Sequence, residues 1–173
     1  QRNFLTMEEA VRLFNTPCKK GIVKRVSLFS LLTGIRYSDI SKLTWEEVQH
    51  SEQEGHYIRF KQQKTDRPVT LPISEEALEF LGERRMEHGK IFLIFIKWDF
   101  DSLIPIWIGD AAIEKHITFH CFRHTYATLQ MAAGTDIFTV SKMLGHKNIK
   151  TTQIYTKIID EKKRETTNKI SFK

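Results

Sequence analysis

The sequence predicts an α+β domain that is mainly α-helical and carries a small three-stranded antiparallel β-sheet. Two observations predict this class. Apolar residues recur at helical spacing towards both ends of the chain, whereas residues 56–62 and 69–71 alternate apolar and polar side chains as half-buried strands do. With 173 residues, 40% of them hydrophobic, the chain is long enough for one domain with a real core, and no repeat or Pro/Gly/Ser-rich linker divides it.

Capping signals mark the expected helices of the N-terminal part. Thr6 followed by Glu9 is the pattern of a capping box, in which each side chain bonds the backbone amide of the other residue. Ser38 is the predicted cap of a short helix, and Thr33–Gly34 ends the helix before it. The expected helices here begin at Thr6 with an inward face of Ala10, Val11, Leu13 and Phe14, and then cover about residues 21–32 and 38–43.

The centre of the chain is predicted to form a β-hairpin. The two alternating stretches flank residues 64–68, which have the composition of a turn. Lys64 is therefore expected near the tip of the hairpin. Residues 45–48 supply the expected third strand.

Helical signals return after the hairpin. Ser74 followed by two glutamates predicts a helix start, with Ala77, Leu78 and Leu81 facing inward. Residues 91–108 are apolar with little period, and Pro105 is expected to rule out one unbroken helix through them. We expect a buried extended piece there, followed by a helix around residues 106–113. The last expected helices cover about residues 120–133, 136–144 and 151–163.

Composition narrows the class of protein. No apolar stretch approaches the roughly 18 to 20 residues of a membrane span, and no apolar leader opens the chain. Cys18 and Cys121 do not form a disulfide framework or a metal knuckle, which fits a reducing compartment. The net charge of +6 favours polyanionic partners. We expect a cytoplasmic, nucleoid-associated protein with no membrane partner, and the absence of a starting Met suggests a fragment.

Four segments are rich in groups suited to phosphate chemistry: 33–39, the Lys64 turn, 120–125 and 144–155. A phosphodiester exchange without a metal needs fixed donors for the negative charge that develops on the non-bridging oxygens. Arginine suits this task because its planar fork contacts two oxygens and keeps its proton. Arg36 and Arg123, from different parts of the chain, could clamp one phosphate between them.

The remaining candidates supply proton transfer and a nucleophile. His120 lies one helical turn before Arg123, so both emerge on one face and the imidazole can donate a further bond. Lys64 could protonate the leaving 5′-oxygen. Tyr155 could form a covalent intermediate that stores the energy of the broken bond, so that rejoining needs no ATP.

Each of these residues also has an ordinary structural interpretation. A lone tyrosine is usually a core or surface residue, a turn lysine is usually solvated, and Arg36 could simply be a cation at a helix end. His120 and His124, at i and i+4, could be a metal pair, but no third ligand at recognisable spacing accompanies them. We therefore predict no metal and no cofactor.

The order of the segments resembles the catalytic domain of tyrosine recombinases of the phage-integrase superfamily, most of all integrases of bacterial mobile elements. The likeness runs from about Phe4 to Lys157 and rests on T-G-I-R-Y-S-D-I, K-T-D-R-P-V-T-L-P, T-F-H-C-F-R-H-T-Y-A-T and L-G-H-K-N-I-K-T-T-Q-I-Y. It implies the fold of these DNA breaking and rejoining enzymes. The site residues that it implies are Arg36 and Arg123 on the phosphate, Asp39 in support, Lys64 as general acid, His120 and His146 as further phosphate contacts, and Tyr155 as nucleophile.

The resemblance also implies a reaction and partners. We expect metal-independent cleavage and rejoining of double-stranded DNA through a 3′-phosphotyrosine, for integration or excision of a mobile element, or alternatively for resolution of chromosome or plasmid dimers. Residues 1–173 would be the catalytic domain without the family's N-terminal core-binding domain. The family acts as a homo-tetramer on DNA, with accessory DNA-bending or excision proteins in some cases, and we expect a monomer for the isolated domain.

Three other functions share part of this pattern. A DNA-binding module without catalysis would share the basic charge. Binding alone, however, does not require a tyrosine, two arginines and two histidines in this order. A type IB topoisomerase uses a similar residue set, although the block that ends in Tyr155 favours recombinases. A metal-dependent nuclease would lose activity in EDTA. The tail, residues 158–173, is either a docking segment or a frayed end.

Overall fold

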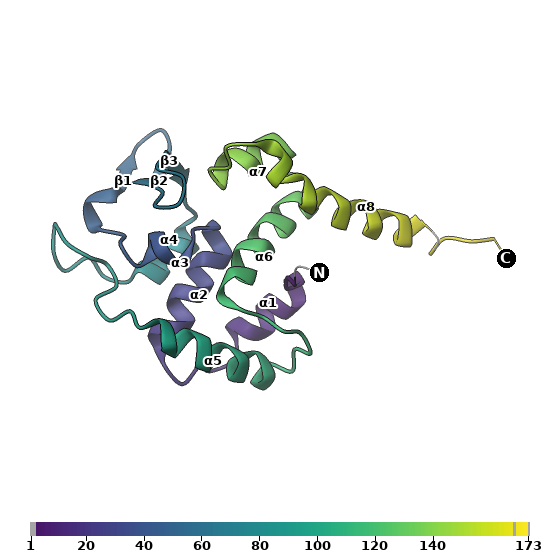
Figure 1. Ribbon diagram of the computed structural model, residues 1–173, viewed down its shortest axis with the longest axis horizontal. Helices are drawn as coiled ribbons and strands as arrows, with labels where there is room; N and C mark the ends of the chain where they lie inside the picture. The colour runs from purple at the N-terminus through teal and green to yellow at the C-terminus, as the bar shows by residue number, and fades with distance from the viewer. Residues whose placement is uncertain (1–2, 168, 173) are drawn as a thin grey trace.

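The computed structural model describes residues 3–167 and 169–172, and its elements are arranged as Figure 1 shows. The helices are α1 (Met7–Phe14), α2 (Gly21–Thr33), α3 (Tyr37–Ile40), α4 (Glu75–Leu81), α5 (Lys97–Asp110), α6 (Phe119–Ala132), α7 (Ile137–Met143) and α8 (Gln153–Thr167), with the short 3-10 helices η1 (Trp45–Glu47) and η2 (Ile149–Thr151). The strands are β1 (Val48–Ser51), β2 (Gly55–Lys61) and β3 (Pro68–Pro72). The predicted class, mainly helical with a small antiparallel sheet, is confirmed.

The sheet is antiparallel in the order β1-β2-β3. Its register pairs Ile58 with Leu71 and Phe60 with Val69, and all four side chains are buried on one face of the sheet. The predicted third strand exists but begins later than expected, because residues 45–47 form η1 and only Val48 starts β1. A capping box explains the shift: the Thr44 amide donates to Glu47 Oε1 at 3.0 Å, which holds these residues in a helical turn.

Two apolar clusters hold the helices together. The larger one packs α2 against α6 and extends through α1, α4, α5 and the sheet, with Phe29, Trp107 and Phe122 among its fully buried members. The smaller one joins the second half of α6 to α7 and α8, and consists of Tyr126, Ala127, Val140, Leu144 and Tyr155. Helix α6 therefore runs from one cluster into the other. Beyond its first turns, α8 projects away from the body of the molecule (Figure 1).

Several predicted helix starts are confirmed. Thr6 and Glu9 form the capping box of α1, with bonds of 2.9 and 3.2 Å, and Ser74 caps α4. The predicted inward face of α1 is partly wrong, since Ala10 and Leu13 are buried while Val11 and Phe14 lie on its exposed side. The predicted Ser38 cap is also wrong, because α3 begins at Tyr37 and has Arg36 at its N-cap position.

Helix α5 overturns the expected structure of residues 91–113. It runs unbroken through Pro105, and of the apolar segment just before it, residues 91–96, only Phe92 is buried. The buried positions of α5 are Asp99, Phe100, Leu103, Ile104, Trp107 and Ile108, which together form a helical stripe. Pro105 lies on the opposite, exposed side. Burial of large side chains at about 1.5–3 kcal/mol each outweighs the cost of about 3 kcal/mol for an interior proline. None of the described helices combines the length and apolar character that a membrane span requires.

Candidate active site

Arg123 joins three distant segments of the chain. It lies on α6 and its side chain is almost fully buried. Its Nη1 donates to the Gly34 carbonyl at 2.6 Å, and its Nη2 donates to the Leu144 carbonyl at 2.9 Å and lies 3.3 Å from His146 Nε2. These contacts bring the turn after α2 and the turn after α7 to one guanidinium group.

Arg36 lies at the same place, at the N-cap of the short helix α3. Arg36, His120 and Arg123 line one cleft of about 360 Å³, whose walls include Tyr37 and Phe100. Within residues 3–167 and 169–172, the buried Arg36 Nη1 has no hydrogen-bond partner. A buried donor without an acceptor is costly, and such exceptions in native proteins call for an explanation. An anionic ligand in the cleft would supply the acceptor.

The two arginines stay charged in a poorly hydrated place. Burial is the main cause that lowers the pKa of Arg123 to about 10, and the like charge of Arg36 lowers it further. Burial also lowers the pKa of Arg36. The charges of Asp39 and Tyr155 oppose both shifts, which places these two groups within electrostatic reach of the arginine pair. The arrangement therefore favours a negatively charged ligand beside both guanidinium groups.

His146 is held by the chain around it. It follows Gly145, whose φ of +67° is a left-handed conformation that glycine adopts without strain. Its Nδ1 lies 2.6 Å from Thr152 Oγ1, and its Nε2 faces Arg123. The imidazole is thus oriented towards the arginine that lines the cleft.

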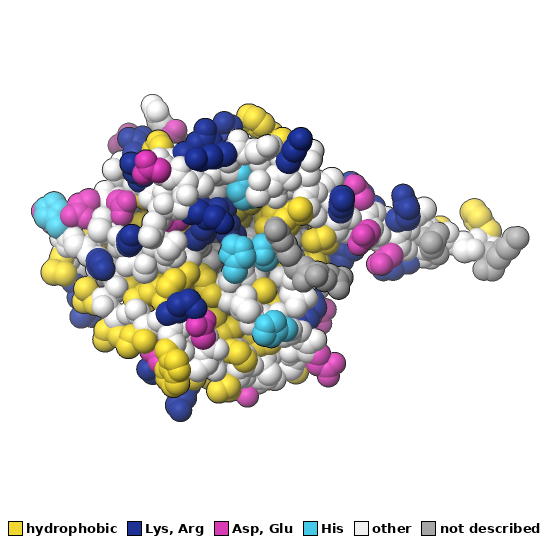
Figure 2. Space-filling model, in the orientation of Figure 1, with side chains coloured by type: hydrophobic (Ala, Val, Ile, Leu, Met, Phe, Trp, Pro, Cys, Tyr) yellow, Lys and Arg dark blue, Asp and Glu magenta, His cyan; other side chains and the backbone are white. Residues whose placement is uncertain are grey.

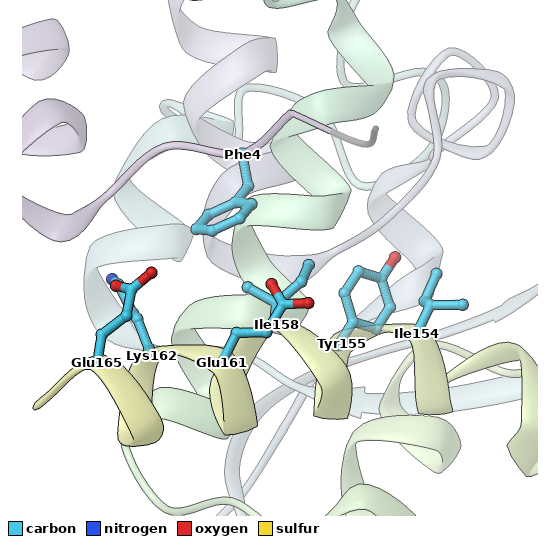
Figure 3. A pocket seen from close by; sticks show the side chains of 7 residues that line it. All are labelled: Phe4, Ile154, Tyr155, Ile158, Glu161, Lys162 and Glu165. Carbon is cyan, nitrogen blue, oxygen red and sulfur yellow. The ribbon is translucent and has the colours of Figure 1, made fainter. Parts of the chain in front are cut away.

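Tyr155 lies in the first turn of α8, and its ring points into the body of the molecule (Figure 3). Only 2% of the residue is exposed. Its hydroxyl is 2.6 Å from Nδ1 of His124, a buried residue next to Arg123 on α6. The ring of His124 in turn meets the ring of His120 edge to face, with centroids 4.5 Å apart. The phenolic oxygen therefore lies beside the helix that carries the arginine.

Lys64 lies in the β2–β3 turn, as predicted, and its side chain is exposed. In the described part of the chain it forms no hydrogen bond or ion pair. The base of the hairpin, however, is fixed on two sides. Asp39 Oδ1 accepts from the Gln63 amide at 2.9 Å, and Gln62 Nε2 donates to the Leu144 carbonyl at 3.0 Å. The lysine is thus free at the tip of an anchored hairpin.

The structure brings Arg36, His120, Arg123 and His146 to one cleft or to each other, and it places Lys64 on a neighbouring turn. Two further residues of the site were not predicted. Gln62 connects the hairpin to Leu144, whose carbonyl Arg123 also uses, and His124 contacts Tyr155. Gln62 carries no sequence signal beyond its place two residues before Lys64, and His124 carries only its place next to Arg123 and its spacing from His120. Among the described residues, no three His, Cys, Asp or Glu side chains form a metal-binding group.

The close approach of Gly145 to Gln62 leads to a stability prediction. A Cβ atom at Gly145 would lie 2.5 Å from Gln62 Oε1, whereas one at Gly55 would meet nothing within 4 Å, although the two glycines have nearly the same φ, +67° and +70°. Gly145→Ala should therefore cost about 1–2 kcal/mol more than Gly55→Ala, because the buried Gln62 must give up hydrogen bonds worth about 0.5–1.5 kcal/mol each. Denaturant unfolding of both variants measures this difference. In a Gln62→Ala background the two substitutions should cost the same, and a persisting difference would contradict the explanation.

Comparison with known proteins agrees with this geometry. Residues 3–162 match the model of the phage integrase family. The integrase of Escherichia phage P2 is 27% identical over 93% of this chain and 44% of its own length. Tyrosine recombinase XerC of Caldanaerobacter subterraneus is 31% identical over 96% of this chain and 50% of its own. Here the chain spans about half the length of the relatives that it matches.

A solved structure extends the likeness to the fold. The catalytic domain of bacteriophage HP1 integrase superposes with a TM-score of 0.70 at 26% identity, over 90% of this chain and 88% of that domain. The match thus covers most of a structure solved as a catalytic domain. Taken with the family match over residues 3–162, it shows that the chain belongs to the phage integrase family.

Proposed function

We propose that the chain is the catalytic domain of a tyrosine-type site-specific DNA recombinase. In this proposal Tyr155 attacks a DNA phosphate and forms a 3′-phosphotyrosine. The single observation that carries it is the convergence of Arg36 and Arg123 on one cleft, with the Tyr155 phenol held beside the same helix. Membership of the phage integrase family supports the same reaction.

The proposed reaction exchanges one phosphodiester for another. The Tyr155 oxygen forms a bond to phosphorus and releases its phenolic proton to solvent, while the bond to the 5′-oxygen breaks and Lys64 gives that oxygen its proton. Arg36, Arg123, His120 and His146 hold the non-bridging oxygens, where charge develops; Asp39 supports the site. In the reverse step the 5′-hydroxyl attacks phosphorus and the phenol leaves. No energy source is needed, because the number of phosphodiester bonds is conserved.

Double-stranded DNA is the proposed substrate. The net charge of the chain is +6, and Figure 2 shows Lys and Arg side chains gathered across the upper part and the centre of one face, with histidines beside the central group. Most contacts should be made to phosphates, so binding should weaken steeply as salt is raised. We further propose that recombination takes place in a tetramer on DNA and that the isolated chain is a monomer. The core-binding domain, which would hold the other side of the DNA, and any accessory proteins would lie outside residues 1–173.

The natural event that we propose is integration or excision of a mobile element, and the similarity to the P2 and HP1 integrases supports it. The 31% identity to tyrosine recombinase XerC is compatible with the alternative, resolution of chromosome or plasmid dimers, and identities of this size do not separate the two events. Sequencing the DNA on both sides of the gene separates the two. Element ends beside the gene would favour integration, whereas an isolated chromosomal gene would favour dimer resolution.

A nicked suicide substrate tests the proposed reaction. Cleavage next to the nick releases a short strand that cannot rejoin, so the protein should accumulate as an adduct with DNA that resists SDS. The adduct should form equally well in EDTA, and peptide mapping should place it on Tyr155. A chain that binds DNA without forming an adduct would be a binding module, and cleavage lost in EDTA would point to a metal-dependent nuclease.

The role of Lys64 can be tested through the leaving group. Lys64→Ala should slow cleavage about 10²- to 10⁴-fold, the usual range for general acid catalysis. A substrate with a 5′-thiolate leaving group needs no proton, and the variant should cleave it at nearly the unaltered rate. Lys61→Ala, a basic residue at the base of the same hairpin that pairs with Asp66, is the matched control and should change neither rate strongly. Equal slowing of both substrates in Lys64→Ala would contradict the acid role.

A further inference from the structure

The contact between His124 and Tyr155 connects two segments that the proposed mechanism does not otherwise join. Their polar atoms lie 2.6 Å apart, although the residues are 31 positions apart in the sequence. Tyr155 is 2% exposed and His124 is 7% exposed, so water competes little for this bond. A short hydrogen bond in a buried place fixes geometry more firmly than the same bond in solvent.

The direction of this bond follows from its chemistry. A phenolic hydroxyl is a stronger donor than the N–H of a neutral imidazole, which favours the phenol as the donor and Nδ1 as the acceptor. When it donates to Nδ1, that nitrogen must carry no proton, and the imidazole is the neutral form protonated at Nε2. The ring is then oriented by its edge contact with His120, whose centroid is 4.5 Å away.

The position of His124 on α6 gives the bond its functional meaning. His124 follows Arg123 directly, so the backbone that fixes the phosphate-binding guanidinium also fixes the partner of the nucleophile. Arg123 is itself held by the Gly34 and Leu144 carbonyls at 2.6 and 2.9 Å. Any movement of α8 that broke the contact with His124 would also move the attacking oxygen relative to the arginine pair.

We propose that His124 is a positioning residue that holds the Tyr155 phenol beside the phosphate site of the same chain. This inference rests on the proposed function and goes beyond it, because neither His124 nor the hydrogen bond belongs to the phosphate-binding set. His124 acts by accepting the phenolic hydrogen bond, so an acceptor atom at the same place should replace it. A displacement of about 1 Å from a reactive geometry can cost about 10²-fold in rate, which sets the size of the effect.

Two variants separate positioning from mere packing. In His124→Asn the Oδ1 atom lies two bonds from Cβ, as Nδ1 does, and can accept the same hydrogen bond. In His124→Leu the side chain keeps its bulk but has no acceptor. Single-turnover adduct formation on the nicked substrate should fall about 10- to 100-fold in His124→Leu and recover to within about threefold of the unaltered chain in His124→Asn. Circular dichroism and thermal unfolding show whether each variant folds.

A spectroscopic measurement tests the bond without DNA. The chain has four tyrosines, so labelling Cζ with ¹³C gives four signals, and Tyr155→Phe identifies the one from Tyr155. That signal should shift in His124→Leu and stay close to its original position in His124→Asn. The Tyr126 signal is the internal control, because its hydroxyl contacts Met143 Sδ instead.

The results of these experiments distinguish failure of the positioning role of His124 from failure of the proposed function. An unaltered Tyr155 signal or an unaltered adduct rate in His124→Leu would overturn the inference, as would a His124→Asn variant that keeps the signal but remains as slow as His124→Leu. That last result would mean that the imidazole serves as a proton acceptor and not as a positioning group. Failure of the unaltered chain to form any adduct would instead overturn the proposed function, while the spectra would still report the bond.

Discussion

Replacing Tyr155 with phenylalanine is expected to abolish the covalent adduct with DNA. Phenylalanine lacks the oxygen that forms the new phosphate ester, and no neighbouring group can supply a nucleophile at the same position. The fold should persist, because the ring keeps its place in the small apolar cluster and the hydrogen bond to His124 is worth about 0.5–1.5 kcal/mol. Adduct formation on the nicked substrate and affinity for intact duplex are the two measurements. Affinity should change little.

Tyr126→Phe is the matched control. Tyr126 belongs to the same cluster and is 3% exposed, and burial raises the pKa of its hydroxyl to about 12, so the group stays neutral. Its hydroxyl contacts Met143 Sδ at 3.6 Å and does not reach His124 in the described structure. This variant should still form the adduct. An adduct from Tyr155→Phe, or loss of the adduct in Tyr126→Phe with the fold intact, would refute the assignment of the nucleophile.

Arg36→Ala and Arg123→Ala are each expected to slow adduct formation by about 10²- to 10³-fold, the usual cost of removing one fixed donor to a developing oxyanion. Their effects on stability should differ. The side chain of Arg36 makes no hydrogen bond within the described residues, and its buried Nη1 has no partner. Arg36→Ala should therefore change the free energy of unfolding by less than about 1 kcal/mol.

Arg123→Ala should destabilise the protein. Burial and the like charge of Arg36 lower the pKa of Arg123 to about 10, so the charged side chain carries a cost in the folded state that alanine would remove. Alanine would also remove two hydrogen bonds from a charged group, at about 1.5–3 kcal/mol each, and leave a cavity. The losses exceed the gain, so we expect a net loss of about 1–3 kcal/mol. Urea unfolding of both variants measures the contrast. Equal stability of the two would show that Arg123 has no structural role.

Local chemistry explains what could be predicted from the sequence. The Thr6 and Ser74 caps and the Lys64 turn depend on residues within a few positions of each other, so their patterns predict them well. The phosphate-site candidates could be predicted because several residue types recur in one order along the chain. That order carries more information than any single arginine or tyrosine.

The remaining features depend on contacts between distant segments. Gln62 meets the Leu144 carbonyl 82 positions away, and nothing near Gln62 indicates that partner. Helix α5 tolerates Pro105 because the proline lies on the side that the rest of the fold leaves exposed. Residues 91–108 are so uniformly apolar that their sequence does not indicate which side of the helix is buried. The His120–His124 spacing suggested a metal pair, whereas the second histidine faces a tyrosine from α8.

The two apolar clusters have a consequence for control of the reaction. Of the two proposed phosphate-binding arginines, Arg123 lies on α6 before that helix enters the small cluster, whereas Tyr155, the proposed nucleophile, belongs to the small cluster of α6, α7 and α8. Loosening of the small cluster would carry the phenol out of range and leave the rest of the protein intact. If Tyr155 is the nucleophile, a local rearrangement of α7 and α8 would be enough to stop the proposed reaction, at a free-energy cost well below that of global unfolding.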